Sequence, residues 1–543
     1  MKANIFKYIF FILVIILVGV AVYILYSDKN NQTMDVKAAK MDFNIIKEIN
    51  IGIISYDTIN PILSNNRDIQ YADKLIFQPL LDITPDFKIK NLLTKEFSKI
   101  DDTTYIAKLR EDVYWHDGTK FTAKDVIFTV NNLKKDNVKS IYKENVSAIN
   151  EIQQIDDYTI KILLKEQIPF FEYRMCFPIL ASHSYEPDTL NSKTSIPIGT
   201  GKYKIVKIEE NLIKLELVDE QSKSKISKIN LVLKNSVSDL YSGFTKNEID
   251  YIITDNTEYE EYIGKIGYNV NQIASREFEY LVLNTEDSIL SNKEIRKAIN
   301  YAIDKKTINY NIYNNKHVES TFPLDYGSYL WNKEELNKYN ITEMKQILTK
   351  NGWGYKNNVW KKKSKKLQFN LIVDYNNKNR LLLAEQIKEQ LESVGIIINI
   401  IKVSNVSYKN YIKYKNYDMI LTGNIVSNCP NLETYFGENN LSNFNNEEIK
   451  TILNDVKNIN DENILTDKYI RIKEIYKQEV PFISLYSNSL FILSNKNLKG
   501  DLSCNWYNLF YNIDNWYKMN QKNTWQKNII IYNNNIQTNV WKT

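Results

Sequence analysis

The segment Leu109–Val130, LREDVYWHDGTKFTAKDVIFTV, limits the fold of this chain more than any other, because it encodes a strand, a tight turn and a helix in direct succession. The residues leading into it alternate polar and apolar side chains from Thr104 to Leu109, which is the period of a half-buried strand. His116-Asp117-Gly118 is typical of a turn, since Asp bonds nearby backbone and Gly accepts positive φ. Thr122 and Asp125 have the capping-box spacing that opens a helix.

His116 and Asp117 stand next to each other and raise the question of a catalytic pair. Adjacent residues on a tight turn rarely converge on one substrate, and triad chemistry needs a nucleophile within reach. We therefore expect a rigid turn between sheet and helix, no catalytic residue and no enzymatic activity. A hydrolase that uses His116 and Asp117 is the alternative.

Two later segments extend the alternation of helices and strands. Ser291–Glu294 has the residues of a capping box, and the apolar positions of Ile295–Ile303 then recur at helical spacing. Arg380–Val394 predicts an amphipathic helix, Gly395 its C-terminal cap, and Ile396–Val403 a buried strand. This alternation indicates an α/β fold.

Composition narrows the classes of function. The 543 residues carry a net charge of +5 with acids and bases interspersed, which argues against a nucleic-acid binder. The lysine cluster at Lys361–Lys366 predicts a solvated hairpin. Cys176, Cys429 and Cys504 lack the spacing of a zinc site; one disulfide could form outside the cell, leaving at least one thiol. With only three histidines, far apart in sequence, we expect no metal site and no cofactor.

The N-terminus predicts a membrane anchor. Tyr8 to Tyr26 is uncharged and mainly aliphatic, about long enough to cross a bilayer core of ~30 Å at ~1.5 Å per residue. Lys2 and Lys7 precede it, which places the N-terminus in the cytoplasm and the body of the chain outside the cell. A cleaved signal peptide is the alternative, with Gly19-Val20-Ala21 as its best site. We predict an uncleaved, single-pass anchor, because the apolar run continues past that site.

A family resemblance covers about Asn44 to Tyr517. The segment LREDVYWHDGTKFTAKDVIFTVNNL resembles the signature of the family 5 extracellular solute-binding proteins, which are the peptide, dipeptide and nickel receptors of ABC importers. Other segments resemble the family in the same order along the chain: Ile196–Ile208 (IPIGTGKYKIVKI), Leu281–Ile308, Leu381–Ile400 and Tyr476–Ile492.

The resemblance implies a two-lobed α/β fold of the type II periplasmic-binding-protein kind, with a small inserted α/β domain. The lobes would close on a ligand about a hinge. The domains expected along the chain are the anchor at 1–27, a tether at 28–43, the first lobe at 44–85, 196–290 and 490–517, the inserted domain at 86–195, the second lobe at 291–489 and a C-terminal extension at 518–543.

The ligand segment departs from the family pattern. In peptide receptors a carboxylate that binds the ligand's α-ammonium follows a Gly-Trp pair in the pattern G-W-x-x-D-x-x-x-P. The matching pair here is Gly423-Asn424. Counting forward from Gly423 places Ser427 at the Asp position, and counting back from Pro430 places Val426 there. The carboxylate of the peptide receptors is therefore missing from this segment.

Three explanations stay open. A peptide could still be held by backbone contacts or by an acidic residue elsewhere; the ligand could lack a free amine, as a modified peptide, a sugar or a metal chelate does; or the pocket could have lost its function. Tyr56 and Asn60 belong to a loop that resembles the ligand-facing loop of the first lobe. The substrate-binding candidates are Tyr56, Asn60, Gly423, Asn424, Ser427 and Asn428.

The resemblance thus implies the substrate-binding component of an ABC importer. It would capture oligopeptide-like ligands by lobe closure and deliver them to membrane permease subunits, as a monomer held by its single N-terminal helix. A sensor ectodomain of the same fold is the alternative.

Overall fold

A computed structural model of the chain describes residues 45–219, 221–255, 257–324, 326–330, 338–459 and 461–520. The predicted anchor, the tether and all but the first residues of the C-terminal extension lie outside these ranges. Across the described ranges, no helix has both the length and the apolar character that a membrane span requires. The body of the chain, Ile46–Lys518, is one compact unit and contains the cores and cavities reported below.

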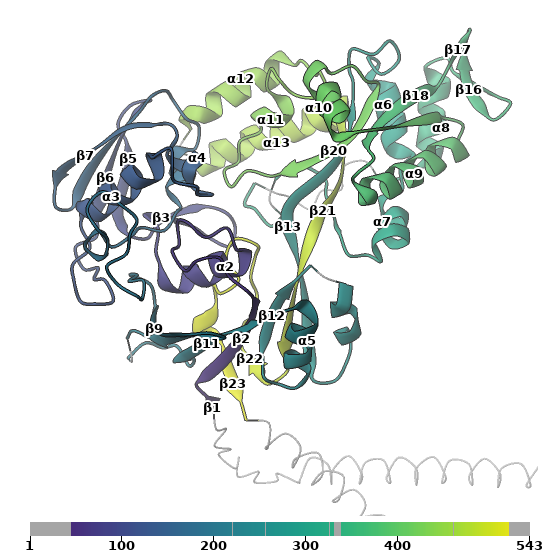
Figure 1. The fold of residues 1–543 in the computed structure, drawn as a ribbon. Helices are drawn as coiled ribbons and strands as arrows, with labels where there is room; N and C mark the ends of the chain where they lie inside the picture. Colours follow the sequence, from purple (N-terminus) through teal and green to yellow (C-terminus); the bar gives the residue numbers. More distant parts are fainter. Residues whose placement is uncertain are drawn as a thin grey trace, which may run out of the picture. The chain divides into compact units, whose positions relative to one another are not determined.

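One long sheet runs through the body (Figure 1). Its strand order is β19-β18-β20-β13-β21-β12-β2-β11-β10-β9, and β14 pairs with β21 beside this path. Its strands are β2 Glu48–Ile54, β9 Tyr203–Glu209, β10 Leu212–Leu217, β11 Lys228–Lys234, β12 Tyr251–Thr254, β13 Tyr268–Leu283, β14 Val318–Glu319, β18 Gln368–Asp374, β19 Ile397–Val403, β20 Met419–Ile425 and β21 Phe482–Asn495.

The two longest strands, β13 and β21, join the halves of this sheet (Figure 1). They pair antiparallel; β21 also pairs with β12 at one end, and β13 with β20 at the other. The register shifts midway, because Ala274 pairs with Ser489 and Phe278 with Ser487. Residues 275–277 therefore stand opposite Asn488 alone and form a bulge, a feature that bends strands locally.

Helices cover both faces of the β20 half of the sheet and form two separate cores. Leu281 and Leu283 of β13 belong to one core, and Tyr280 and Val282 to the other, as alternation along a strand requires. The first core packs against α6 Lys293–Tyr301, α7 Lys305–Tyr313, α8 Ile341–Lys350 and α9 Lys378–Ser393. The second packs against α10 Asn405–Tyr414, α11 Glu433–Phe436, α12 Glu447–Asp455 and α13 Glu462–Glu479.

The β2 half of the sheet has two cores of its own, beneath α2 Arg67–Ile76 and α5 Val237–Thr245. A separate four-stranded sheet, in the order β5-β6-β8-β7, packs with α3 around a further core. The strands and helices of this region are β5 Thr94–Lys99, β6 Thr104–Leu109, α3 Ala123–Lys134, α4 Lys143–Val146, β7 Ile149–Asp156 and β8 Thr159–Leu164. This sheet lies within the range predicted for the inserted domain, although the exact domain boundaries stay predictions.

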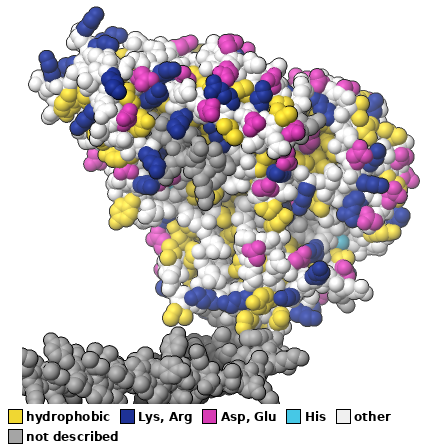
Figure 2. Space-filling model, turned by 180° about the vertical axis from the view of Figure 1, so that it is seen from behind, with side chains coloured by type: hydrophobic (Ala, Val, Ile, Leu, Met, Phe, Trp, Pro, Cys, Tyr) yellow, Lys and Arg dark blue, Asp and Glu magenta, His cyan; other side chains and the backbone are white. Residues whose placement is uncertain are grey.

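Short elements complete the described chain. The remaining strands are β1 Ile45–Ile46, β3 Leu81–Ile83, β4 Ile89–Asn91, β15 Gly354–Lys356, β16 Val359–Lys362, β17 Lys365–Lys366, β22 Leu498–Lys499 and β23 Tyr517–Met519. The 3-10 helices are Phe171–Met175, Ser182–Ser184, Thr257–Tyr262, Val456–Asn458 and Ile513–Asn515. On the face shown in Figure 2, acidic and basic side chains are interspersed.

The predicted strand–turn–helix segment is confirmed. Residues alternate between buried and less buried along β6, and Gly118 has a φ of +87° in the turn that follows. The carboxylate of Asp125 accepts the backbone N–H of Thr122 at 2.9 Å, as the capping box requires. The lysine-rich hairpin is confirmed as well, in β16 and β17.

Two local predictions were wrong. The cap of α6 is Asn292, whose side-chain oxygen accepts the N–H of Glu294 at 2.9 Å; the helix begins one residue later than a box capped by Ser291 requires. The strand predicted as buried, β19, ends the sheet of described strands, where it pairs with β18, and Ile401 is 37% exposed. An apolar run does not distinguish an edge strand from a central one. The three cysteines are free.

Candidate functional site

Among the described strands, the last residues of β20 have a partner on one side only. β13 pairs with β20 along its whole length, whereas β18 pairs with it only at Met419 and Ile420. The hydroxyl of Tyr408, on α10, donates to the carbonyl of Leu421 at 2.9 Å. Gly423–Ile425, beyond the last pair with β18, then presents a strand edge whose backbone groups can pair with an added chain.

A cavity of about 380 Å³ lies at this edge. Its walls come from β13, the last residue of α7, the residue before β14, the start of α9, β20 and β21. The lining residues are Glu277, Phe278, Glu279, Tyr313, His317, Asn377, Asn379, Arg380, Gly423, Asn424, Ile425 and Asn488. Its size lies within the range of small-ligand sites.

An ion pair forms part of the wall. The carboxylate of Glu279 accepts hydrogen bonds from Nε and Nη2 of Arg380, at 2.7 Å and 2.8 Å. Burial raises the pKa of Glu279, and the Arg380 guanidinium works against that rise. Gly423 stands opposite Glu279, and a Cβ there would lie 2.4 Å from Oε1 of Glu279 and 2.6 Å from Nη2 of Arg380. The ion pair therefore fills the space that a side chain at position 423 would need.

Glu277 gives the cavity its uncompensated charge. It stands opposite Ile425 across the β13–β20 pair, and its carboxylate accepts a hydrogen bond from the side-chain amide of Asn488. Within the described ranges, no lysine or arginine pairs with Glu277. Burial lowers the pKa of His317 to about 4, so this imidazole is neutral at pH 7. The lining thus carries a net negative charge and suits a cation, such as an ammonium group.

The bulge of β13 contacts two other parts of the chain through Arg276. The guanidinium of Arg276 donates to Oδ1 of Asn428 and lies 4.2 Å from the centre of the Trp506 ring. Its carbonyl accepts the N–H of Val426 at 2.9 Å. Arg276 thereby connects β13 both to the loop after β20 and to the segment that follows β22.

The residues predicted from sequence near β20 separate into two groups. Gly423 and Asn424 line the cavity together, and the Asn424 amide also donates to the hydroxyl of Tyr435 at 2.8 Å. Asn428 binds Arg276 instead, and Ser427 is exposed, with its Oγ 3.1 Å from Sγ of Cys429.

The two residues predicted in the first lobe do not line this cavity. Tyr56 packs, partly buried, against the core of β2. Asn60 shapes its own loop: its Oδ1 accepts the N–H of Ile62 at 3.2 Å, and its amide lies 3.5 Å from the hydroxyl of Tyr185. The structure does not bring these two residues together with Gly423.

Sequence reasoning missed Glu277, Glu279 and Arg380. The first two alternate with Phe278 and Tyr280 along β13, and such alternation could have placed both acids on one face. Nothing in the linear pattern pairs Glu279 with Arg380, since these residues lie 101 positions apart.

His116 and Asp117 do not form a pair with each other. Nε2 of His116 donates to the carbonyl of Gly201 at 3.0 Å, and Nδ1 accepts the N–H of Gly199 at 3.2 Å. Asp117 instead binds His183, at 2.8 Å. His116 thus ties the turn before α3 to the IPIGTG segment, a structural role.

Comparison with known proteins assigns the family. The family described as "Bacterial extracellular solute-binding proteins, family 5 Middle" matches residues 88–446, which is more than half of the chain. The chain belongs to this family. As a family 5 protein it is an extracytoplasmic solute-binding protein of the ABC-transporter type, not an enzyme.

The oligopeptide-binding protein AppA of Bacillus subtilis is 22% identical over 499 residues, which cover 86% of this chain and 91% of AppA. The unliganded open form of MppA, a periplasmic murein tripeptide binding protein, matches with a TM-score of 0.76 and 17% identity, over 88% of this chain and 98% of MppA. The nickel ABC transporter structure from Bacillus halodurans matches with a TM-score of 0.74 and 18% identity, over 86% and 98%. These structures show that the family 5 chain has a mixed α/β periplasmic-binding-protein fold.

Proposed function

We propose that this family 5 protein captures an oligopeptide-like ligand outside the cell and delivers it to an ABC permease. The observation that carries the proposal is the half-open edge of β20 at the cavity. An extended peptide can add to such an edge as a strand and bind through its main chain. Binding through the main chain does not depend on the peptide side chains, which suits a receptor for peptides of varied sequence. The likeness to oligopeptide-binding AppA over nearly its full length supports the same ligand class.

Glu277 supplies the carboxylate that the segment after Gly423 has lost. It lies on β13 opposite Ile425 and lines the same cavity as the end of β20, where it can receive the α-ammonium of a bound peptide. This corresponds to the first explanation left open by the sequence, a peptide held by backbone contacts and an acidic residue elsewhere. An ammonium–carboxylate pair that is desolvated on closure typically costs about 2–5 kcal/mol when one partner is removed.

Lobe closure would follow from the position of the bulge. β13 and β21 connect the two halves of the sheet, and the bulge at 275–277 lies between these halves and beside the cavity. A ligand that contacts both halves favours the closed form by its differential affinity for that form. In this proposal Gly423 and Asn424 contact the ligand directly, and Tyr56, Asn60, Ser427 and Asn428 contact it only after closure. A micromolar ligand contributes about −8 kcal/mol, enough to shift such an equilibrium strongly.

The proposal is tested by the solutes that the protein retains. Full-length protein is purified in detergent, and its bound solutes are released by denaturation and identified by mass spectrometry. The emptied, refolded protein is then mixed with a casein digest and separated from unbound peptides. We expect peptides with free amino termini in either fraction. Retention of haem, sugars or metal chelates, with no peptide in either fraction, would overturn the proposal.

A further inference from the structure

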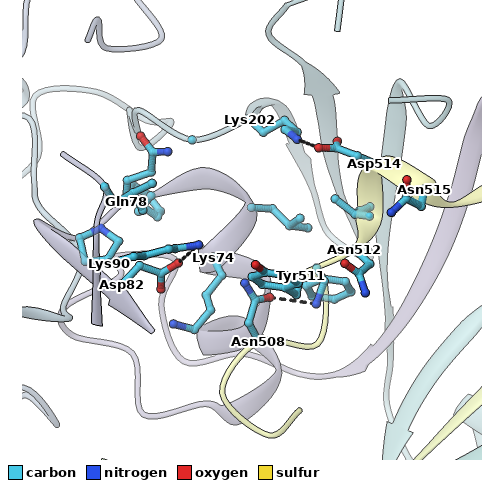
Figure 3. A pocket seen from close by; sticks show the side chains of 17 residues that line it. Lys74, Gln78, Asp82, Lys90, Lys202, Asn508, Tyr511, Asn512, Asp514 and Asn515 are labelled. Atoms are coloured by element: carbon cyan, nitrogen blue, oxygen red, sulfur yellow. Dashed lines mark hydrogen bonds and ion pairs between the residues drawn. The ribbon is translucent and has the colours of Figure 1, made fainter. Parts of the chain in front are cut away.

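A second cavity, of about 400 Å³, shares no lining residue with the cavity at β20 (Figure 3). Its charged side chains are compensated in place. Figure 3 shows the ion pair of Lys202 with Asp514, and Nζ of Lys90 lies 3.1 Å from Oδ2 of Asp82. The ammonium of Lys74 lies 3.6 Å from the centre of a buried tyrosine ring that does not line this cavity. Of the two cavities, the one at β20 therefore has the charge that a ligand can reach.

The backbone that carries this charge, at Glu277, is held by two hydrogen bonds. The N–H of Glu277 donates to Oγ of Ser275 at 3.2 Å, within the bulge of β13. The carbonyl of Arg276 accepts the N–H of Val426 at 2.9 Å. The bulge therefore has a defined shape, although residues 275–277 leave the regular register of the strand pair.

The side chain of Glu277 needs a contact of its own to be held in one orientation. Glutamate is long, and fixing its rotatable bonds costs conformational entropy. Glu279 lies two residues further along β13 and lines the same cavity. Burial raises the pKa of Glu279, and the negative charge of Glu277 raises it further, so the two carboxylates are close enough to repel each other.

Asn488 provides the contact that holds the Glu277 carboxylate. It stands alone opposite residues 275–277, lines the cavity, and donates a hydrogen bond from its side-chain amide to Oε2 of Glu277. Within the described ranges Oε1 of Glu277 makes no hydrogen bond. One oxygen of the carboxylate is thus held by β21, and the other remains for a ligand.

We propose that Asn488 is a positioning residue, which orients the Glu277 carboxylate so that the site selects peptides with a free α-ammonium. This inference rests on the proposed function and adds to it the residue through which Glu277 becomes selective. A carboxylate that is already held in its binding orientation loses less conformational entropy when the ligand binds. Asn488 acts through Glu277 and is not itself the partner of the ammonium group.

The proposal is tested by calorimetric titration of full-length protein with the tightest-binding peptide from the casein digest, in its free and N-acetylated forms. The measured quantity is the affinity for the free form divided by the affinity for the acetylated form. We expect Asn488→Ala to lower this ratio about fivefold. Asn488→Gln keeps an amide donor and should lower the ratio less than twofold. Asn271→Ala, at a half-buried position of β13 outside the cavity lining, is the matched control and should leave the ratio unchanged.

A second arm places Asn488→Ala in the Glu277→Gln background, where no charge remains to be positioned. We expect no further change in the ratio there. A further fivefold fall would show that Asn488 acts on the ligand directly, which would overturn the positioning role. Asn488→Ser keeps the test decisive if the alanine variant does not fold. Its hydroxyl is too short to reach the carboxylate, so we expect the same fall as for alanine.

The outcomes separate this inference from the proposed function. If the wild type binds peptides but Asn488→Ala has the ratio of Asn271→Ala, or weakens both peptide forms equally, the positioning role is overturned and peptide capture stands. If the wild type binds no peptide in either form, the proposed function is overturned and this inference with it.

Discussion

The carboxylate of Glu279 and the guanidinium of Arg380 face each other across two hydrogen bonds, at 2.7 Å and 2.8 Å, beside Gly423. Both side chains are 17% exposed, so solvent screens this pair only in part. The pair joins β13 to the first turn of α9 and neutralises one of the two glutamates in the cavity. The net negative charge of the lining therefore comes from Glu277, the last residue of the bulge.

Gly423→Ala should destabilise the fold by about 2 kcal/mol, because the added Cβ would lie 2.4 Å from the Glu279 carboxylate and would force the ion pair apart. Urea unfolding of the full chain measures the difference. Gly354→Ala is the control, since its Cβ would meet nothing closer than 3.9 Å. An equal effect at positions 354 and 423 would show that the close approach at Gly423 is not what requires glycine.

Glu277→Gln should weaken binding of peptides with a free amino terminus at least about thirtyfold, or ~2 kcal/mol, while leaving their N-acetylated forms unaffected. The reason is that glutamine keeps the shape of the side chain and its hydrogen bond with Asn488 but removes the charge. Peptides recovered from the casein digest serve as probes, measured by calorimetry. Glu286→Gln, an exposed acid past the end of β13, is the control. If the variant loses both forms of the peptide equally, Glu277 does not select the ammonium group.

His317 should make stability depend on pH in acid. Burial lowers its pKa to about 4 in the folded chain from an ordinary value of 6.5. Between these values the unfolded chain takes up a proton that the folded chain does not, so this contribution is present above pH 6.5 and is lost as the pH falls towards 4.

The contribution of His317 is measured by comparison with a variant that cannot titrate. Unfolding free energies of the wild type and His317→Asn are determined from pH 7 to pH 4. We expect a shallower slope in the variant, by up to about 1.4 kcal/mol per pH unit. Parallel curves would mean that His317 becomes protonated as easily in the folded chain as in the unfolded one.

His116→Phe should destabilise the fold by about 2 kcal/mol, because it leaves the Gly201 carbonyl and the Gly199 N–H without their side-chain partner. Asp117→Asn should cost less than about 1 kcal/mol, since its pair with His183 is about one third exposed. Both are measured by urea unfolding. A larger loss of stability for Asp117→Asn than for His116→Phe would show that Asp117, and not His116, is the residue that holds this turn in place.

The residues around α3 show which structural features the local sequence predicts. The period of two in β6, the turn ending at Gly118 and the box of Thr122 and Asp125 were predicted and confirmed, because each depends on neighbours within a few positions. The helix at Lys293 was predicted at nearly the right place with the wrong cap, since Ser291 and Asn292 both have an oxygen that can reach a free N–H. The exposure of β19 was not predictable locally, because it depends on which strands lie beside it.

For the candidate site, too, the sequence predicted some features and only the structure gave the others. The sequence by itself identified the family, located the departure at Gly423-Asn424 and showed that the expected carboxylate is absent there. Only the tertiary structure placed Glu277 across from Ile425, joined Glu279 to Arg380 and left the end of β20 without β18 beside it. The physical reason is that caps, turns and periodicity act over a few residues, whereas a cavity forms where strands and helices distant in sequence pack together.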